Sequence, residues 1–250
     1  PSVVVNDAKR QGLKVLRVDI NRSQAQCVRL DERKIRLGFN YVRGIGESAA
    51  EHLMEVRQGR VFRDLQDFCQ RCDLSQRQVE NLIQAGAFDG FQLSRRDLIW
   101  ELGNLRDEDE LELDYDDGVD LPELTRLDKL NMEYDALGLS TDDHIMAMLR
   151  DWLREKGILD SQGVESVTGG QLIRCAGLVV VRQAPPTAKG FRFITLEDEF
   201  GFINVIVRPQ VYERYLRVLR NEQLLLVHGE VQRERAVVNV VARGIWKLLM

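Results

Sequence analysis

The chain has 250 residues, of which 44% are apolar and 30% charged, enough to bury a core and to divide into two or three units. Its net charge of −5 argues against a nucleic-acid-binding protein. The charge is uneven, however: residues 101–123 contain eleven acidic residues and one basic residue, whereas residues 170–250 contain twelve basic and seven acidic residues. Outside the acidic strip the chain is neutral to basic, so a nucleic-acid partner is not excluded.

Four cysteines do not make a disulfide framework, and the sequence has neither a signal peptide nor an apolar stretch of membrane length. We therefore expect a cytoplasmic protein without membrane contact. Cys69 and Cys72 have the spacing of half a zinc site, but no second pair accompanies them. They share a helical period with Leu65 and Phe68, which favours a packing role over metal binding.

Residues 1–34 contain a predicted strand at 14–20 followed by a turn at Asn21. The sequence starts at Pro1 and its first element begins abruptly. We interpret this segment as the end of a larger domain whose body lies upstream.

Residues 35–100 are predicted to form a tandem helix–hairpin–helix module. The short apolar segment 35–42 leads through a Gly-x-Gly turn into a helix at 49–58. A helix at 74–84 then leads through an Ala-Gly-Ala turn into a helix at 94–102, with Ser94 as N-cap and Asp97 in the capping position. Two such units can straddle duplex DNA and contact the phosphates of both strands without reading bases.

Glycines let the backbone approach a phosphate closely, and the N–H groups and positive dipole end of a helix N-terminus hold the anion. The predicted DNA contacts of the two hairpins are Arg43, Gly44, Ile45, Gly46, Ser48, Ala85, Gly86, Ala87, Arg95 and Arg96. The alternative is that both turns are ordinary helix connections in a small bundle.

Residues 101–165 are predicted to be an acidic linker with connecting helices. The run that starts at Asp107 is rich in Asp and Glu and poor in apolar residues. Like charges in a row repel one another and favour a solvated segment, so we do not interpret the run as a metal site.

Residues 166–250 are predicted to form a five-stranded OB-fold barrel. The expected strands are 172–182, 191–198, 201–207, 224–231 and 236–241, with a helix at 209–219 before the fourth strand. This order is that of the OB fold, whose exposed face commonly binds single-stranded nucleic acid. The predicted fold class is α+β multidomain: a tandem helix–hairpin–helix module followed by this barrel.

Alternation in the second barrel strand places Phe191, Phe193 and Thr195 on one face and Arg192, Ile194 and Leu196 on the other. The sequence does not show which face is outward; aromatic side chains on an outer face would stack on bases. The candidate barrel contacts are Phe191, Phe193, Arg174, Arg182, Lys189, Arg208 and Arg233. For each cation, a solvated surface charge is the alternative.

Several segments, in chain order, carry a family resemblance: Asp19-Ile20-Asn21-Arg22-Ser23, Val42-Arg43-Gly44-Ile45-Gly46-Glu47, Leu82-Ile83-Gln84-Ala85-Gly86-Ala87-Phe88-Asp89, Glu133-Tyr134-Asp135-Ala136-Leu137-Gly138-Leu139 and Thr195-Leu196-Glu197-Asp198-Glu199-Phe200-Gly201. Together they resemble the bacterial C-family replicative DNA polymerases of the polymerase III alpha type. The resemblance implies that residues 1–34 end the fingers domain, 35–100 bind duplex DNA, 101–165 connect, and 166–250 form the OB fold.

The barrel hairpin at 181–190 most resembles the error-prone, damage-inducible branch of this family. The resemblance implies a polymerase of translesion synthesis whose palm aspartates hold Mg²⁺. The palm motif is not in these residues, so we expect no cofactor and no catalytic residue here. The segment would hold duplex and single-stranded DNA for a palm located upstream.

Residues 102–121 contain no good match to the clamp-binding peptide of the replicative relatives. The resemblance therefore implies that the sliding clamp is reached indirectly, through accessory proteins of a mutagenesis complex. His144 stands where the family usually has a His-Pro pair, and we interpret it as a capping or surface residue.

Two other functions fit parts of the sequence. A protein-interaction module would recruit the accessory mutagenesis proteins, and its binding would survive high salt, whereas phosphate contacts weaken steeply. A fragment of a DNA ligase or tRNA synthetase is disfavoured by the order of hairpins before barrel and by the lack of a nucleotide-binding lysine motif.

Overall fold

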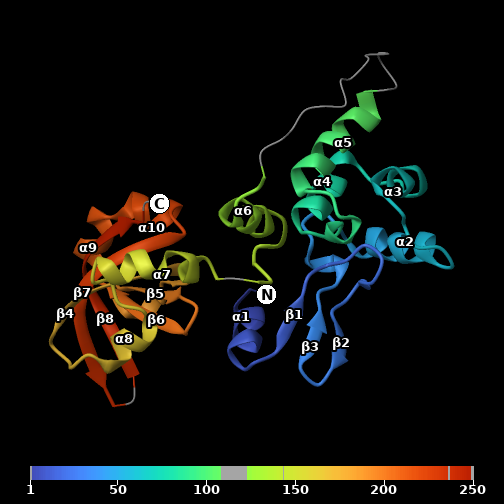
Figure 1. Ribbon diagram of the computed structural model, residues 1–250. Coiled ribbons are helices and arrows are strands. Elements are labelled where there is room, and N and C mark those ends of the chain that lie inside the picture. Colours follow the sequence, from blue (N-terminus) through green and yellow to red (C-terminus); the bar gives the residue numbers. More distant parts are fainter. Residues whose placement is uncertain (1, 108–122, 143, 236, 249–250) are drawn as a thin grey trace. The chain divides into compact units, whose positions relative to one another are not determined.

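The computed structural model describes residues 2–107, 123–142, 144–235 and 237–248 (Figure 1). The chain divides into two compact units, Pro1–Asp142 and Asp143–Met250. Most of the acidic run that starts at Asp107 lies outside the described residues, and so does most of the segment 102–121, which has no good match to a clamp-binding peptide. The family resemblance divides the chain differently, into the segments 1–34, 35–100, 101–165 and 166–250, and that division stays a prediction.

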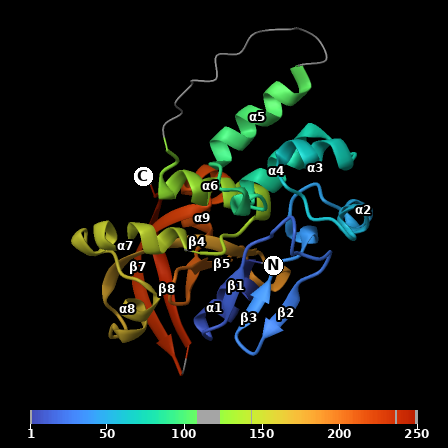
Figure 2. The same ribbon diagram turned by 45° about the vertical axis from the view of Figure 1, so that its right-hand side comes forward.

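The first unit combines a small sheet with a set of helices. Its elements are α1 (Ser2–Arg10), β1 (Lys14–Leu16), β2 (Val28–Asp31), β3 (Lys34–Arg36), the 3₁₀ helix η1 (Phe39–Tyr41), α2 (Glu47–Arg57), α3 (Leu65–Arg71), α4 (Gln76–Gln84), the 3₁₀ helix η2 (Asp89–Phe91), α5 (Arg95–Asp107) and α6 (Arg126–Leu137). The strand order is β1-β3-β2, with β1 parallel to β3. Both ribbon views place α2–α5 beyond the same end of this sheet (Figures 1 and 2).

One predicted element of this unit differs from the structure. The strand predicted at 14–20 ends at Leu16, because β3 offers pairing partners only to residues 14–16 and the N–H of Ile20 instead donates to Ala87 O. The apolar segment 35–42, which leads into the predicted Gly-x-Gly turn, is β3 followed by η1. Gly38 separates them in an extended conformation, packed so tightly on Ala25 and Gln26 that an added Cβ would overlap their backbone.

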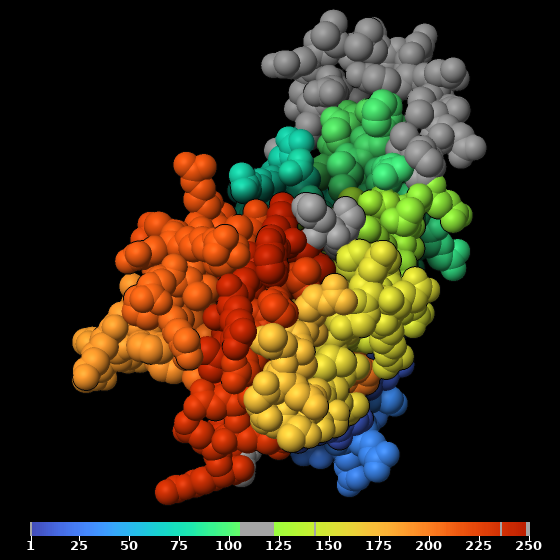
Figure 3. Space-filling model, turned by 90° about the vertical axis from the view of Figure 1, so that its left-hand side faces the viewer, coloured from blue at the N-terminus to red at the C-terminus, as the bar shows by residue number. Residues whose placement is uncertain are grey.

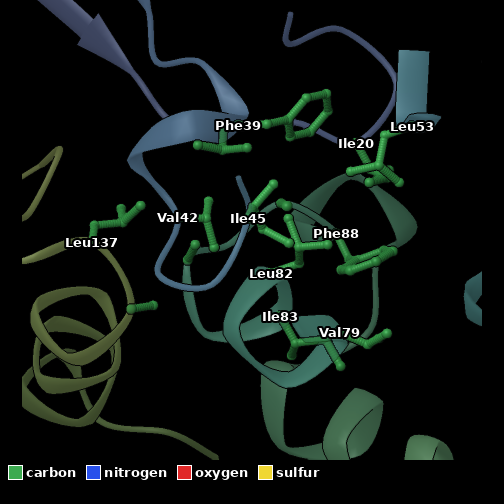
Figure 4. Packing of buried hydrophobic residues seen from close by; sticks show 14 of the residues in the cluster. Ile20, Phe39, Val42, Ile45, Leu53, Val79, Leu82, Ile83, Phe88 and Leu137 are labelled. Carbon is green, nitrogen blue, oxygen red and sulfur yellow. The ribbon is translucent and has the colours of Figure 1, made fainter. Parts of the chain in front are cut away.

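One continuous apolar core fills the first unit (Figure 4). Phe39, Val42 and Ile45 enter it from η1 and the following turn, opposite Leu82 and Ile83 of α4. A chain of edge-on aromatic contacts extends it, with ring centroids 5.0 Å apart for Phe62–Phe68 and 5.0 Å for Phe68–Phe88. The turn after η1 is thus fixed from inside by apolar contacts.

Arg95 is the polar centre of this unit and is only 2% exposed. Its guanidinium donates to both carboxylate oxygens of Asp89, at 3.0 and 2.9 Å, to Glu133 Oε1 at 3.1 Å and to Gln84 O at 2.9 Å. Glu133 Oε1 also lies 3.1 Å from Arg17 Nε, and its Oε2 accepts from the Ser140 hydroxyl at 2.8 Å. The network joins Arg17, just after β1, to η2, α5 and α6.

The second unit is a closed five-stranded barrel preceded by two helices. Its elements are α7 (Ile145–Glu155), α8 (Ser161–Ser166), β4 (Leu172–Gln183), β5 (Arg192–Glu197), β6 (Phe202–Val207), α9 (Pro209–Arg214), α10 (Leu216–Asn221), β7 (Leu224–Glu234) and β8 (Val237–Lys247). The closed order is β4-β5-β6-β8-β7, with β6 parallel to β8. The predicted OB-fold order of three strands, helix and two strands is confirmed.

The last two strands are longer than predicted, and the helix is divided. A register shift between His228 and Gly229 lets β7 and β8 continue pairing as far as Lys247. The helix predicted at 209–219 breaks at Tyr215 into α9 and α10, which lie over one end of the barrel core. Figure 3 shows β7 and β8 (red) with α7 and α8 (yellow) on one face of this unit.

A buried acidic turn between β5 and β6 holds α7 and α8 on the barrel. Asp198 is fully buried; it accepts from the N–H of Ser161 at 2.6 Å, from its hydroxyl at 2.7 Å and from the N–H of Gly201 at 2.9 Å. Arg150 of α7 binds Glu199 through two hydrogen bonds of 2.6 and 2.9 Å. This turn lies in the motif 195–201 that carried part of the family resemblance. His144, expected at a cap or on the surface, is buried and accepts from Met146 N–H as the N-cap of α7.

Arg95→Ala should lower the free energy of unfolding of the first unit by about 3–5 kcal/mol, because it leaves Glu133 and Asp89 without their buried cation. The control is Arg77→Ala, an exposed arginine, which should change it by less than about 0.5 kcal/mol. Urea unfolding is followed by the fluorescence of Trp100 in a Trp152→Phe, Trp246→Phe background. Equal midpoints for the two variants would contradict the structural role of Arg95.

Candidate nucleic-acid interfaces

The first hairpin presents its backbone to solvent at residues 43–48. The N–H of Ile45 donates to Val42 O at 3.0 Å, closing a turn in which Gly44 has a φ of +81° that favours glycine. Ile45 is buried and anchors the turn, whereas Arg43, Gly44 and Gly46 are exposed. The structure therefore brings the first group of predicted contacts together, with Ile45 contributing backbone only.

The first turn of α2 offers N–H groups to an anion. Gly46 is its N-cap and supplies no side chain to accept from them, and Ser48 lies exposed in the same turn. Glu47 also lies in this turn, where its carboxylate interacts favourably with the helix dipole and competes with an external anion. An approaching phosphate must therefore gain from backbone N–H groups and from neighbouring cations.

Side chains of helix α4 form hydrogen bonds with the backbone of the first hairpin. The side-chain amide of Gln78 donates to Gly44 O at 2.9 Å, and that of Asn81 donates to Arg43 O at 2.8 Å. The hairpin carbonyls are thus bound to α4, and the first turn of α4 lies next to the hairpin. Arg77 in that turn is exposed, with no ion pair to another described residue.

The second predicted hairpin is the C-terminal cap of helix α4 and does not present N–H groups to solvent. The N–H groups of Gly86 and Ala87 donate to Ile83 O and Leu82 O, both at 2.9 Å, in the pattern of a Schellman motif. Ala85, Gly86 and Ala87 are buried. The residues are those of a helix C-cap, and they do not form a second phosphate-facing turn.

The two arginines after that turn also differ in role. Burial by itself would lower the pKa of Arg95, but the hydrogen bonds and charges of Asp89 and Glu133 outweigh it and raise the pKa. Arg95 is therefore a charged core residue whose donors are already engaged. Arg96 is half-buried near Asp128, whose pKa its charge helps to lower after the larger effects of the Thr125 hydrogen bonds. The predicted cap of α5 is confirmed by Ser94 and Asp97, which exchange hydrogen bonds of 3.2 and 3.1 Å.

The helix expected at 74–84 is α4 and the helical period around Cys69 is α3, but their arrangement as a pair was not predicted. They are joined by a short turn at residues 72–75, and Ser75 forms a capping box with Gln78. The Ser-x-x-Gln spacing was the available signal.

In the barrel, the alternation of β5 is now resolved. Ile194 and Leu196 are buried in the core, whereas Phe193 points outward with 36% exposure. On the neighbouring strand Phe202 also points outward, with 38% exposure, and Ile203 and Val205 point inward. The aromatic face of β5 is therefore on the outside, while Phe191 is half-buried just before the strand.

The outward face continues across three strands. Phe193 is paired with Ile206, and Thr195 with Asn204, which in turn is paired with Asn239 of β8. Beside these positions lie two hollows of about 430 and 490 Å³, the first lined by Phe202, Asn204 and Val237 and the second by Arg208, Gln232 and Val241. Arg233 borders both. Strands two and three of an OB fold, with the loops beside them, are the usual surface for oligonucleotides.

The predicted barrel cations fall into two groups. The guanidinium groups of Arg174, Arg182 and Arg233 donate to backbone carbonyls, among them Lys156 O, Leu219 O and Val167 O. Lys189, at the tip of the β4–β5 loop, and Arg208, at the end of β6, are exposed, and their side chains have no hydrogen bond or ion pair to another described residue. These two have their donors available for a ligand beside the aromatic face.

The described residues contain no group of three or more His, Cys, Asp or Glu side chains placed to hold a metal ion. Cys69 lies in α3 and Cys72 is its C-cap, as the helical pattern predicted. Burial raises the pKa of the Cys72 thiol to about 12, so it stays protonated at neutral pH and is a poor metal ligand. No helix in the described part of the chain is both long enough and apolar enough to cross a membrane.

Two family profiles match the chain: a helix-hairpin-helix motif over residues 12–98 and an OB-fold nucleic acid binding domain over residues 173–248. Error-prone DNA polymerases of Bdellovibrio bacteriovorus, Burkholderia mallei and Cutibacterium acnes are 31, 36 and 37% identical to it over 99, 97 and 86% of its length. The chain is related to the error-prone DNA polymerases. It spans only 26, 23 and 19% of the lengths of these three relatives.

The resemblance found in the sequence is thereby confirmed, and so is the order of a helix–hairpin–helix module before an OB fold. Among solved structures, asparaginyl-tRNA synthetase from Pyrococcus horikoshii matches 36% of this chain and 22% of that chain, with 19% identity and a TM-score of 0.31. Nothing about function follows from so weak a similarity.

Gly86→Ala should destabilise the first unit by more than 1 kcal/mol, because φ is +78° and the new Cβ would overlap the guanidinium of Arg95. Gly46→Ala should cost about 1 kcal/mol or less, since φ is −80° and nothing lies within 4 Å of the added Cβ. Urea midpoints of the two variants provide the comparison. A Gly86→Ala protein as stable as Gly46→Ala would show that the turn is not a closed helix cap.

Proposed function

We propose that this chain is the DNA-holding part of an error-prone DNA polymerase. The observation that carries the proposal is the outward face of β5, β6 and β8, where Phe193 and Phe202 stand exposed with Lys189 and Arg208 at its edge. Exposed aromatic rings beside uncommitted cations are what sequence-independent binding of single strands requires. The confirmed relationship to error-prone polymerases supports this assignment.

The two rings would contact different nucleotides. Phe193 pairs with Ile206, so Phe193 and Phe202 are four residues apart along the strand direction, which is about 13 Å. Between them lie the polar side chains of Thr195, Asn204 and Asn239. A single strand would stack on a ring at each end of this row and be held by polar contacts between.

The duplex would be held by the first hairpin alone. Its backbone N–H groups, the exposed Arg43 and the neighbouring Arg77 form a sequence-independent phosphate contact. Arg95 is left out of this surface because its guanidinium is enclosed in the core. The turn at 85–87 is left out because its N–H groups are bonded within α4.

In the parent enzyme, translesion synthesis would be carried out by a palm domain outside this chain. Palm aspartates would bind Mg²⁺, which stabilises the attacking and leaving oxygens of nucleotidyl transfer. The residues of this chain would position DNA without taking part in the chemistry. Accessory mutagenesis proteins, and through them the sliding clamp, are the partners we propose.

Binding of a primed duplex should depend on Arg43 and Arg77. The Arg43→Gln, Arg77→Gln double variant should reduce the slope of log K against log salt by about 1.8, because each phosphate contact contributes about 0.9. Arg33→Gln, an exposed arginine in the β2–β3 turn, is the matched control. Fluorescence anisotropy across a salt series measures the slope, and an unchanged slope in the double variant would remove the hairpin from the interface.

Binding of a labelled thymidine strand of about 20 nucleotides should depend on the two outward aromatics. Phe193→Ala and Phe202→Ala should each weaken it by about 1–3 kcal/mol, the usual contribution of one base–aromatic stack. Leu172→Ala, another exposed apolar residue of the barrel, should have no effect.

The same titration tests the competing protein-interaction function. No binding to either DNA at low salt, together with salt-resistant binding to accessory proteins, would favour that function and overturn ours.

A further inference from the structure

A small pocket lies where β4, β5 and the α9–α10 pair meet, next to the outward aromatic face. Its volume is about 230 Å³, and its walls include Arg182, Arg192, Arg220, Phe193, Tyr212 and Leu219. No carboxylate lines it among the described residues. It is distinct from the two hollows along β6 and β8, with which it shares no residue.

Cations converge in this pocket on a single phenol. The guanidinium carbon of Arg192 lies 4.7 Å from the centroid of the Tyr212 ring, a cation–π distance. The pKa of Tyr212 is lowered, first by a hydrogen bond from Arg220 and then by the charge of Arg220 and by the charge and hydrogen bond of Arg192. Both guanidinium groups therefore act on the same hydroxyl. Arg182 is fixed close by through hydrogen bonds to Leu219 O and Glu222 O at 2.9 and 2.6 Å.

The remaining walls suit a flat apolar group. Phe193 contributes a ring that is 36% exposed, and Leu219 contributes a buried aliphatic surface. The volume is smaller than the roughly 300–1,000 Å³ of pockets for drug-sized ligands, so it suits one ring system. With Arg182 engaged by backbone carbonyls, Arg192 and Arg220 are the guanidinium groups that can bind an anion here, and guanidinium groups match phosphate geometry.

We propose that this pocket binds one nucleotide of the single strand, with its base against Phe193 and its phosphate between Arg192 and Arg220. The proposal rests on the proposed function in one respect: Phe193 belongs both to the pocket and to the outward DNA-binding face. A strand leaving that face would pass directly into the pocket. The pocket would then fix the position of one base, whereas the open face would bind the strand without fixing the position of any base.

The test uses the whole 250-residue chain and thymidine 5′-monophosphate as the probe, with thymidine and inorganic phosphate as partial ligands. Calorimetric titration should show that the monophosphate binds more tightly than either part. Ring resonances of ¹³C-labelled tyrosine and phenylalanine should shift at Tyr212 and Phe193. Arg220→Gln and Arg192→Gln should each weaken binding by about tenfold, the usual effect of losing one charge-assisted hydrogen bond.

Arg217→Gln is the matched control, because Arg217 is exposed on the same helix α10 but does not line the pocket. It should leave the dissociation constant within about twofold. Equal effects of the variants at positions 217 and 220 would reduce the result to general surface charge and overturn the site.

Two further outcomes separate this proposal from the wider one. If the thymidine strand binds but the monophosphate leaves Tyr212 and Phe193 unshifted, the pocket is overturned while the DNA-holding function stands. If the monophosphate binds in the pocket and the strand does not bind, the pocket stands only as a site for a free nucleotide, and the DNA-holding function fails. A short peptide of two aspartates followed by leucine and phenylalanine, binding where the monophosphate does not, would assign the pocket to a protein partner instead.

Discussion

A buried arginine bonded to two carboxylates connects the helices of the first unit, and it fixes the end of the helix that contacts the exposed hairpin. Arg95 bonds to Gln84 O and thereby fixes the end of α4, while Glu133 brings α6 onto the same guanidinium. Helix α4 in turn carries Gln78, whose amide holds the carbonyl of Gly44. The backbone that faces solvent at the hairpin is therefore positioned by a charge in the core.

The second unit also contains a buried arginine bound to a carboxylate. Arg150 binds Glu199 at the β5–β6 turn, and Asp198 in that turn accepts hydrogen bonds from Ser161 and Gly201. Burial by itself would lower the pKa of Arg150, but Glu199 and Asp198 outweigh it and raise the pKa. Buried ion pairs add little net stability, yet removing one partner is costly, so such pairs mainly determine which arrangement is allowed.

The architecture could be predicted from the sequence, whereas the roles of single residues could not. Alternation and turn residues were sufficient for the barrel, because apolar Ile194 and Leu196 must share a face. They could not show that this face is inward, since Phe193 and Phe191 are also apolar. The Ala85-Gly86-Ala87 turn looked like a hairpin because glycine marks both a helix C-cap and a phosphate-binding turn. Only the destination of its N–H groups distinguishes the two.

The roles of the arginines could not be predicted from the sequence either, because an arginine can bind a ligand only if its N–H donors are not already hydrogen-bonded within the protein. Arg174, Arg182 and Arg233 are exposed but bond to backbone carbonyls, whereas Lys189 and Arg208 do not. Few uncommitted cations therefore border the outward face, and stacking must supply most of its affinity for a single strand. The face would then hold DNA with a shallower salt dependence than its arginine content suggests, since only the phosphates that meet available cations release counterions.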